Sequence, residues 1–364
     1  MILKPAPSTM PSLDLFVCPS VALKSSTKLY QGLTSEEKAR AAVKFSFSTH
    51  PNRLNNHNIT RVVGYGANGV CLAGTDSNGR ALCLKVIYRP RVSSAHVVNA
   101  EVEAYRNLSS ADYSPNLLSY VADWQDECHI YLVCELFGSD WSCCGSTQSS
   151  LEPLVFSYGY NGATVPCHLS FCAGASDLWA YRDYLTATRG NCKIPITQIK
   201  QIIRQAALGL SYMHSRGYYH GDVKAENILL ESCQGVKIAD LGSAKHVSSG
   251  LKAYGTVDIT PPELLNDSPF SASELDGRDA DIFALGLVLV TLLNESSDLP
   301  AVVKDAQNGS LSYKELIALN GGIIPLGDTS NFDKDALHLL SNMMEVEPAM
   351  RYSVAQVLSH RFLQ

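Results

Sequence analysis

The sequence predicts an α+β protein with two lobes, a small strand-rich lobe followed by a larger helical one. From Ile59 onward the apolar residues form short runs that are separated by polar turns such as Asp76-Ser77-Asn78-Gly79, which is typical of strands. Past Ser176 the apolar residues recur at helical spacing instead. A chain of 364 residues is long enough to give each lobe a core of its own.

Composition and charge argue against several classes of protein. The net charge is −6 and 18% of the residues are charged, so we expect no binding of nucleic acid. The longest apolar runs, such as Ile282 to Leu293, are too short to span a bilayer. The N-terminus makes a poor signal peptide, so we expect an intracellular protein, cytoplasmic or nuclear. The 11 cysteines are scattered, which favours free thiols over a disulfide framework.

The order of the predicted elements divides the chain into four parts. Residues 1–55 are rich in Ser, Pro and Lys, and we expect a largely disordered extension with one helix after the capping-box pair Thr34 and Glu37. The small lobe is predicted over 56–137, an insertion over 138–176 and the large lobe over 177–364. Strands are expected in the small lobe at 61–63, 70–73, 81–87, 117–121 and 129–136, with a helix over 94–108. Helices are expected in the large lobe over 177–187, 197–216, 279–294, 312–319, 333–345 and 353–362.

The insertion over 138–176 combines thiols with aromatic residues. A zinc site is conceivable, but the spacing of Cys143, Cys144, Cys167, His168 and Cys172 does not match a CxxC pair. We therefore expect a flexible or locally packed loop. Its aromatic residues suggest that it packs on the small lobe; they are Phe156, Tyr158, Tyr160 and Phe171.

The most informative segment is the octapeptide His220-Gly221-Asp222-Val223-Lys224-Ala225-Glu226-Asn227, with Asp240-Leu241-Gly242 beginning 18 residues after Asp222. It places an acid, a cation and an amide at fixed spacing, with a second acid before a glycine. Phosphoryl transfer from ATP requires that set: Asp222 to orient and deprotonate the acceptor hydroxyl, and Lys224 to neutralise the moving phosphoryl group. Asn227 and Asp240 would then hold Mg²⁺.

The small lobe carries a glycine pattern, Gly64-x-Gly66-x-x-Gly69, between two predicted strands. The pattern alone is also compatible with an ordinary hairpin turn. A dinucleotide site would need a helix after the third glycine, whereas Val70-Cys71-Leu72 continues as a strand. A flap whose backbone amides approach phosphates therefore fits this pattern.

Lys85 lies in an otherwise apolar strand, 16 residues after Gly69. A cation in such surroundings is costly unless it is paired, and Glu101 on the next predicted helix is the natural partner.

With these motifs the chain resembles the eukaryotic protein kinase family over about residues 59–364. The further matching segments are Ile130 to Phe137 as fifth strand and hinge, Thr256 to Glu263 as the end of an activation segment, Asp281 to Gly286 as the central buried helix, and Arg351 as the partner of Glu263. The resemblance implies ATP and Mg²⁺ as cofactors.

The resemblance also implies roles for individual residues. Lys85, braced by Glu101, would hold the α- and β-phosphates under the flap of Gly64, Gly66 and Gly69. The adenine would meet backbone groups of Glu135 and Phe137 and the side chains of Cys71, Cys83 and Leu229, with Cys134 as gatekeeper. Lys224, two residues after Asp222, is similar to the pattern of serine/threonine kinases, which implies protein substrates carrying Ser or Thr.

Several individual positions qualify or refine this resemblance. Gly221 replaces an arginine that most family members carry and that a phosphorylated activation loop quenches, so we predict activity without a strict need for loop phosphorylation. Leu241 replaces a phenylalanine but keeps apolar packing, and buried thiols at 71 and 83 are expected to be inert. Asp177 and Glu226 would favour basic residues near the target hydroxyl.

Two alternatives remain open beside an active kinase. A pseudokinase scaffold would bind ATP or partners without transfer, but Lys85, Asp222, Asn227 and Asp240 are all present. A small-molecule phosphotransferase can also carry His-Gly-Asp, yet such enzymes lack the Pro261-Pro262-Glu263 segment and its arginine partner. The sequence gives no indication of the oligomeric state.

Overall fold

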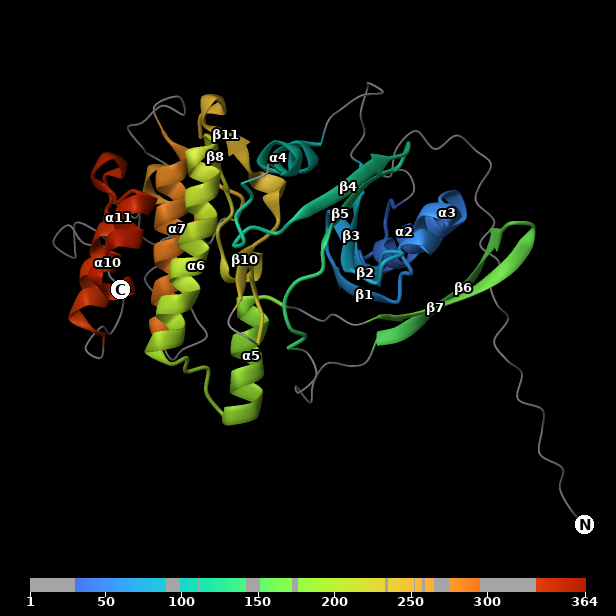
Figure 1. Ribbon diagram of the computed structural model, residues 1–364, viewed down its shortest axis with the longest axis horizontal. Helices are drawn as coiled ribbons and strands as arrows, with labels where there is room; N and C mark the ends of the chain where they lie inside the picture. Colours follow the sequence, from blue (N-terminus) through green and yellow to red (C-terminus); the bar gives the residue numbers. More distant parts are fainter. Residues whose placement is uncertain are drawn as a thin grey trace, which may run out of the picture. The chain divides into compact units, whose positions relative to one another are not determined.

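The computed structural model describes residues 30–89, 99–109, 112–141, 151–171, 176–232, 235–251, 253–256, 259–264, 275–294 and 332–364 (Figure 1). These residues form two compact units. The first takes its described residues from 30–89, 122–136 and 151–171, and the second takes the remainder. The predicted helix at 312–319 and three cysteines of the insertion, Cys143, Cys144 and Cys172, lie outside the described residues.

The first unit is built on a seven-stranded sheet with the order β4-β5-β3-β2-β1-β7-β6. The strands are β1 Arg61–Tyr65, β2 Gly69–Thr75, β3 Ala81–Tyr88, β4 Tyr120–Gln125, β5 His129–Glu135, β6 Leu151–Tyr160 and β7 Ala163–Phe171. Strands β1, β2, β3 and β5 pair antiparallel in turn, whereas β7 joins β1 in parallel. The strand expected at 117–121 begins only at Tyr120.

Two helices precede the sheet, α2 Ser35–Thr49 and α3 Pro51–Asn56. The predicted capping box is present: the Glu37 N–H donates to Thr34 Oγ1 at 3.3 Å, and the Thr34 N–H donates to the Glu37 carboxylate at 2.8 Å. The buried face of α2 repeats at helical spacing, with Ala39, Ala42 and Val43 fully buried. The expected disorder is therefore wrong for residues 30–55, because the apolar face of α2 covers the sheet.

The described part of the insertion is a hairpin of β6 and β7 that extends the sheet beyond β1 (Figure 1). Its turn at Asn161-Gly162 has positive φ at both residues, which suits a two-residue hairpin connection. Alternate side chains of the hairpin are buried; they are Leu154, Phe156, Tyr158, Leu169 and Phe171. A flexible loop is thus the wrong expectation for 151–171, whereas packing of its aromatic residues on the small lobe is confirmed.

The core of the first unit draws on three segments that are distant in sequence. It combines residues of α2 and α3, the face of the sheet formed by alternate residues of β2, β3 and β5, and the inner face of the hairpin. Its central members are Val43, Phe47, Leu54, Leu72, Leu84, Val86, Val133, Phe156 and Leu169. Without α2 and the hairpin this apolar face of the sheet would be exposed to water, which is unfavourable.

The second unit is mainly helical, as predicted. Its longer elements are α4 Ala100–Leu108, α5 Leu178–Arg189, α6 Ile196–Ser215, α7 Gly277–Leu293, α10 Lys334–Met343 and α11 Val354–Ser359. Most residues of α7 are buried, consistent with its apolar sequence. Short strands β8 Tyr218–Tyr219 and β9 Ile228–Leu230 flank the octapeptide, and they pair antiparallel with β11 Lys245–His246 and β10 Val236–Ile238, respectively. Among the residues described, no helix is both long and apolar enough to cross a membrane.

Candidate functional site

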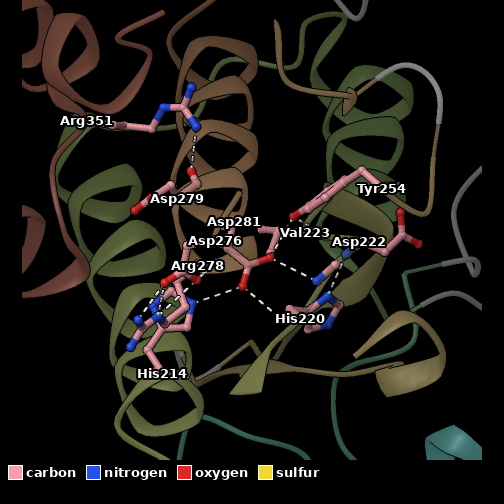
Figure 2. A network of polar contacts seen from close by, with 11 residues as sticks. His214, His220, Asp222, Val223, Tyr254, Asp276, Arg278, Asp279, Asp281 and Arg351 are labelled. Atoms are coloured by element: carbon pink, nitrogen blue, oxygen red, sulfur yellow. Dashed lines mark hydrogen bonds and ion pairs between the residues drawn. The ribbon is translucent and has the colours of Figure 1, made fainter. Parts of the chain in front are cut away.

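The octapeptide forms a loop that is organised by one buried carboxylate, Asp281 of α7 (Figure 2). Asp281 Oδ2 accepts the N–H of His220 at 2.7 Å, and Oδ1 accepts the N–H of Gly221 at 2.9 Å. A ring nitrogen of His214 lies 2.9 Å from Oδ2. Because Asp281 has no solvent exposure, hydrogen bonds from donors such as these take the place of water around its carboxylate.

Asp222 follows in this loop and lies among three polar side chains of the second unit. Asn227 Nδ2 donates to the Asp222 carbonyl at 2.7 Å and to Oδ2 at 3.1 Å. Lys224 Nζ lies 3.1 Å from Asp222 Oδ2 and donates to Thr256 Oγ1 at 2.8 Å. Thr256 in turn donates to Asp222 Oδ1 at 2.6 Å. A carboxylate, an ammonium group and a hydroxyl thus form one connected cluster.

Asn227 and Asp240, the two residues predicted to hold Mg²⁺, carry amide and carboxylate oxygens. Their backbones are neighbours, since the N–H of Ala239 donates to the Asn227 carbonyl at 2.9 Å. The amide nitrogen of Asn227 serves as the donor to Asp222, so its amide oxygen is the atom suited to a cation. Asp240 is exposed and carries a left-handed backbone with φ of 59°. Carboxylate and amide oxygens are ligands that Mg²⁺ prefers.

The segment after Asp240 packs near α4, within the second unit. Leu241 is fully buried, so its apolar packing in place of phenylalanine is confirmed. A Cβ built on Gly242 would lie 3.8 Å from Glu101 Oε2, which places the Glu101 carboxylate beside this segment. Lys85 lies on β3 of the first unit, and its pairing with Glu101 stays a prediction.

The end of the activation segment is anchored by a buried ion pair. Arg351 donates through both terminal nitrogens to Glu263, at 2.8 and 3.0 Å. The side chains of Arg351 and Glu263 are 0% and 1% exposed. The predicted partnership of these two residues is therefore confirmed, and its bidentate geometry is the strong form of such a pair.

The residues predicted to bind nucleotide in the first unit share one face of the sheet. Cys71 is paired in register with Lys85, and Cys83 with Cys134. Cross-strand partners point to the same face, so these four side chains lie opposite the face that α2 covers. The glycine pattern forms the connection between β1 and β2, where the N–H of Gly66 donates to the Gly69 carbonyl at 2.9 Å.

The two thiols at 71 and 83 interact with each other. A hydrogen bond with Cys71, followed by burial, raises the pKa of the Cys83 thiol well above its usual value of 9.0. Because the thiolate is the reactive form, this environment favours the predicted inert thiol.

The predicted hinge spans the boundary between the two units. Glu135 ends β5, and Phe137 belongs to the second unit. The Lys237 ammonium lies 5.0 Å from the centre of the Phe137 ring.

Asp177 and Glu226 are close enough to influence one another. Burial and then the negative charge of Glu226 raise the pKa of Asp177 from 3.8 to about 6. Asp177 caps α5 by accepting the N–H of Ala180 at 2.8 Å, and its backbone forms a bridge to Leu229 of β9. The second unit therefore brings Asp177, Glu226 and Leu229 to the same neighbourhood as the octapeptide.

Sequence reasoning missed Tyr254 and His214, both of which contact Asp281. Tyr254 lies directly before Gly255-Thr256 in a stretch of mixed polar and apolar residues, so the sequence carries no clear signal that its side chain is buried. His214 lies on the buried face of α6, where a satisfied core histidine is not distinguishable by sequence from any other.

The family of the chain follows from comparison with known proteins. The family model described as protein kinase domain matches residues 168–363, which is more than half of the chain. The chain therefore belongs to the protein kinase family.

Curated relatives are serine/threonine kinases by name. The probable serine/threonine-protein kinase KCC4 of Saccharomyces cerevisiae is 29% identical over 47% of this chain and 16% of its own length. The serine/threonine-protein kinase SBK1 of Danio rerio is 28% identical over 46% of this chain and 43% of its own length. The probable cell cycle serine/threonine-protein kinase CDC5 homolog of Encephalitozoon cuniculi is 24% identical over 84% of this chain and 54% of its own length. The chain thus spans about half or less of these relatives.

Proposed function

We propose that the protein is a serine/threonine protein kinase that transfers the γ-phosphoryl group of ATP to hydroxyl groups of protein substrates. The observation that carries this proposal is the cluster of Asp222, Lys224 and Thr256, with distances of 2.6 to 3.1 Å between their polar atoms. A carboxylate next to an ammonium group is the arrangement that such transfer needs. The family membership and the names of the relatives support the same reaction class.

The cluster assigns a task to each side chain. Asp222 accepts the proton of the substrate hydroxyl, because it is the carboxylate whose two oxygens are held in a fixed position by Asn227 and Thr256. Lys224 stabilises the negative charge of the phosphoryl group in transfer. Asn227 and Asp240 hold Mg²⁺, which when bound neutralises phosphate charge.

The nucleotide assignments remain part of the proposal. Gly64, Gly66 and Gly69 approach the phosphates through their backbone amides, and Lys85 with Glu101 binds the α- and β-phosphates. Cys71, Cys83 and Leu229 contact the adenine ring, and backbone groups of Glu135 and Phe137 bind its edge. The shared face of Cys71, Cys83 and Lys85 supports this assignment for the first unit.

We infer a preference for basic residues near the target hydroxyl. Burial is the main cause of the raised pKa of Asp177, and the negative charge of Glu226 adds to it, so the two carboxylates lie within electrostatic reach of each other. A substrate cation that binds between them would relieve this repulsion.

We also propose that activity has no strict need for phosphorylation of the activation loop. Position 221 carries no side chain, so the loop holds no cation there for a phosphate to neutralise. A Ser248→Ala, Ser249→Ala double variant with Thr256 intact is expected to keep its activity, and loss of activity would contradict this point.

The proposed function is tested by Mg²⁺-dependent transfer from labelled ATP to a serine/threonine peptide library. Unphosphorylated wild-type protein is compared with Asp222→Asn, which keeps the shape of the side chain but removes its basicity. Transfer by the wild type alone supports the proposal, and the preferred peptides test the basic-residue inference. ATP binding without transfer by either protein would instead favour a pseudokinase scaffold.

A further inference from the structure

Tyr254 is a buried residue that directly precedes Gly255-Thr256 in the activation segment. The proposed phosphoryl transfer assigns it no role. Its side chain is 7% exposed. The hydroxyl donates to Asp281 Oδ1 at 2.8 Å and accepts the N–H of Val223 at 3.2 Å (Figure 2). Tyr254 therefore joins three separate segments of the second unit: the activation segment, α7 and the octapeptide.

The contact with Val223 acts on the peptide unit of the proposed catalytic base. The N–H of Val223 and the carbonyl of Asp222 belong to the same planar peptide group. That carbonyl accepts a hydrogen bond from Asn227 at 2.7 Å, while the N–H donates to Tyr254. Because both ends of a rigid plane are held, the backbone orientation from which the Asp222 side chain projects is fixed.

The contact with Asp281 completes the set of donors around a buried charge. His214, the backbone N–H groups of His220 and Gly221, and the Tyr254 hydroxyl supply two close contacts to each carboxylate oxygen. Of these four donors, Tyr254 is the one that comes from the activation segment. Burial and the charge of Asp281 raise the pKa of Tyr254 well above its usual value of 10, so the hydroxyl keeps its proton at neutral pH.

We propose that Tyr254 is a positioning residue that holds the activation segment and the Asp222-Val223 peptide in the catalytic arrangement without a phosphate. The inference rests on the proposed kinase function and explains how a chain with glycine at 221 orders this segment. A second backbone contact lies beside it, since the N–H of Gly255 donates to the Gly221 carbonyl at 2.7 Å. In this role the Tyr254 hydroxyl takes the place of the pairing that most family members form between an arginine at position 221 and a phosphorylated residue of the activation loop.

The test removes only the hydroxyl, in Tyr254→Phe, and uses full-length protein whose intact mass shows no phosphate. We expect kcat for peptide phosphorylation to fall about 10- to 100-fold, as for loss of a buried hydrogen bond that orients a catalytic group. KM for ATP should change less than about threefold, because the hydroxyl contacts none of the proposed nucleotide ligands.

Tyr219→Phe is the matched control. Tyr219 is also buried, and its hydroxyl donates to the carbonyl of Gly250 at 2.9 Å, on the same segment but away from the Asp222 peptide. We expect kcat of this variant to stay within about threefold of wild type. Equal losses of kcat in both variants would overturn the proposal in favour of a general loosening of the segment.

Amide hydrogen exchange at Val223 gives a reading that does not depend on catalysis. The Val223 N–H should be protected in the wild type, exchange faster in Tyr254→Phe and be unchanged in Tyr219→Phe. Rapid exchange at Val223 in the wild type would overturn the proposal even if Tyr254→Phe failed to fold. An inactive wild type with protected Val223 would count against the kinase function alone, whereas an active wild type matched by Tyr254→Phe would count against the role of Tyr254 alone.

Discussion

At the scale of single residues, Gly221 is held in a conformation that other residues rarely adopt. Its φ is +78°, and a Cβ at this position would lie 2.6 Å from the carbonyl oxygen of Ser243. A side chain at 221 therefore requires both a left-handed backbone and movement of a neighbouring segment. The glycine fits this backbone without strain. An arginine placed here would be strained, so the substitution would not restore the arrangement that is usual in the family.

We expect Gly221→Ala to lower the free energy of unfolding by about 1–3 kcal/mol, because it adds left-handed strain and a steric clash. Chemical denaturation of the two proteins measures the difference. Gly159→Ala is the control, since no atom lies within 4 Å of its added Cβ, and we expect a change below about 1 kcal/mol. Equal stability of wild type and Gly221→Ala would show that the loop relaxes freely.

Asp177 gives a prediction about pH. Its pKa is about 6 in the folded protein, against about 4 expected for an unfolded chain. Between these values the folded state binds a proton that the unfolded state lacks, so this group's contribution to stability falls as pH rises from about 4 to about 6. Asp177→Asn removes that loss and keeps a residue that caps helices well.

Thermal unfolding should therefore show a higher Tm for Asp177→Asn than for wild type at pH 7.5 and little difference at pH 4. Asp279, whose pKa is also raised to about 6, is present in both proteins, so its contribution cancels in the comparison. A gain in Tm that is the same at both pH values would contradict a titrating origin.

At the scale of elements, the β6–β7 hairpin and α2 are structural parts of the first unit. The sequence analysis expected a loop and did not predict the hairpin, although its apolar residues alternate and Asn161-Gly162 is a strong turn signal. The sequence did not show that β7 would pair in parallel with β1, a contact between residues about 100 positions apart. Such pairing depends on the shape of both partners and has no local signature.

We expect Phe156→Ala to destabilise the first unit by about 3–5 kcal/mol, because Phe156 is fully buried on the face of the sheet that α2 covers, with its ring against Phe47. Val155→Ala on the same strand is the control; its side chain is 47% exposed, and we expect a change below about 0.5 kcal/mol. Urea unfolding followed by circular dichroism compares the two. Similar small losses in both would mean that the hairpin is only loosely attached.

At the scale of the whole molecule, bound nucleotide should stabilise the protein, and the effect should depend on Mg²⁺. At ATP concentrations about 100 times Kd, binding to the folded state alone adds about 2.7 kcal/mol. We expect Mg²⁺ with ATP to raise Tm clearly, and ATP with a chelator to raise it less.

The matched variant is Asp240→Asn, which is expected to unfold like wild type without ligand, because Asp240 is exposed and an asparagine oxygen can still accept the N–H of Gly242. Its response to Mg²⁺ should be largely lost. An equal rise in Tm with and without chelator would contradict the assignment of Asn227 and Asp240 as metal ligands.

The sequence by itself determined the α+β class, the order of most elements and the residues of the octapeptide, because these depend on local periodicity and on short motifs. It also predicted the partnership of Glu263 with Arg351, which the structure confirms as a buried bidentate pair. Tertiary structure alone decided the burial of the apolar face of α2 against the sheet, the incorporation of the hairpin into the sheet and the position of Tyr254. Each of these depends on which distant surfaces meet, and neither apolar periodicity nor motif spacing specifies that.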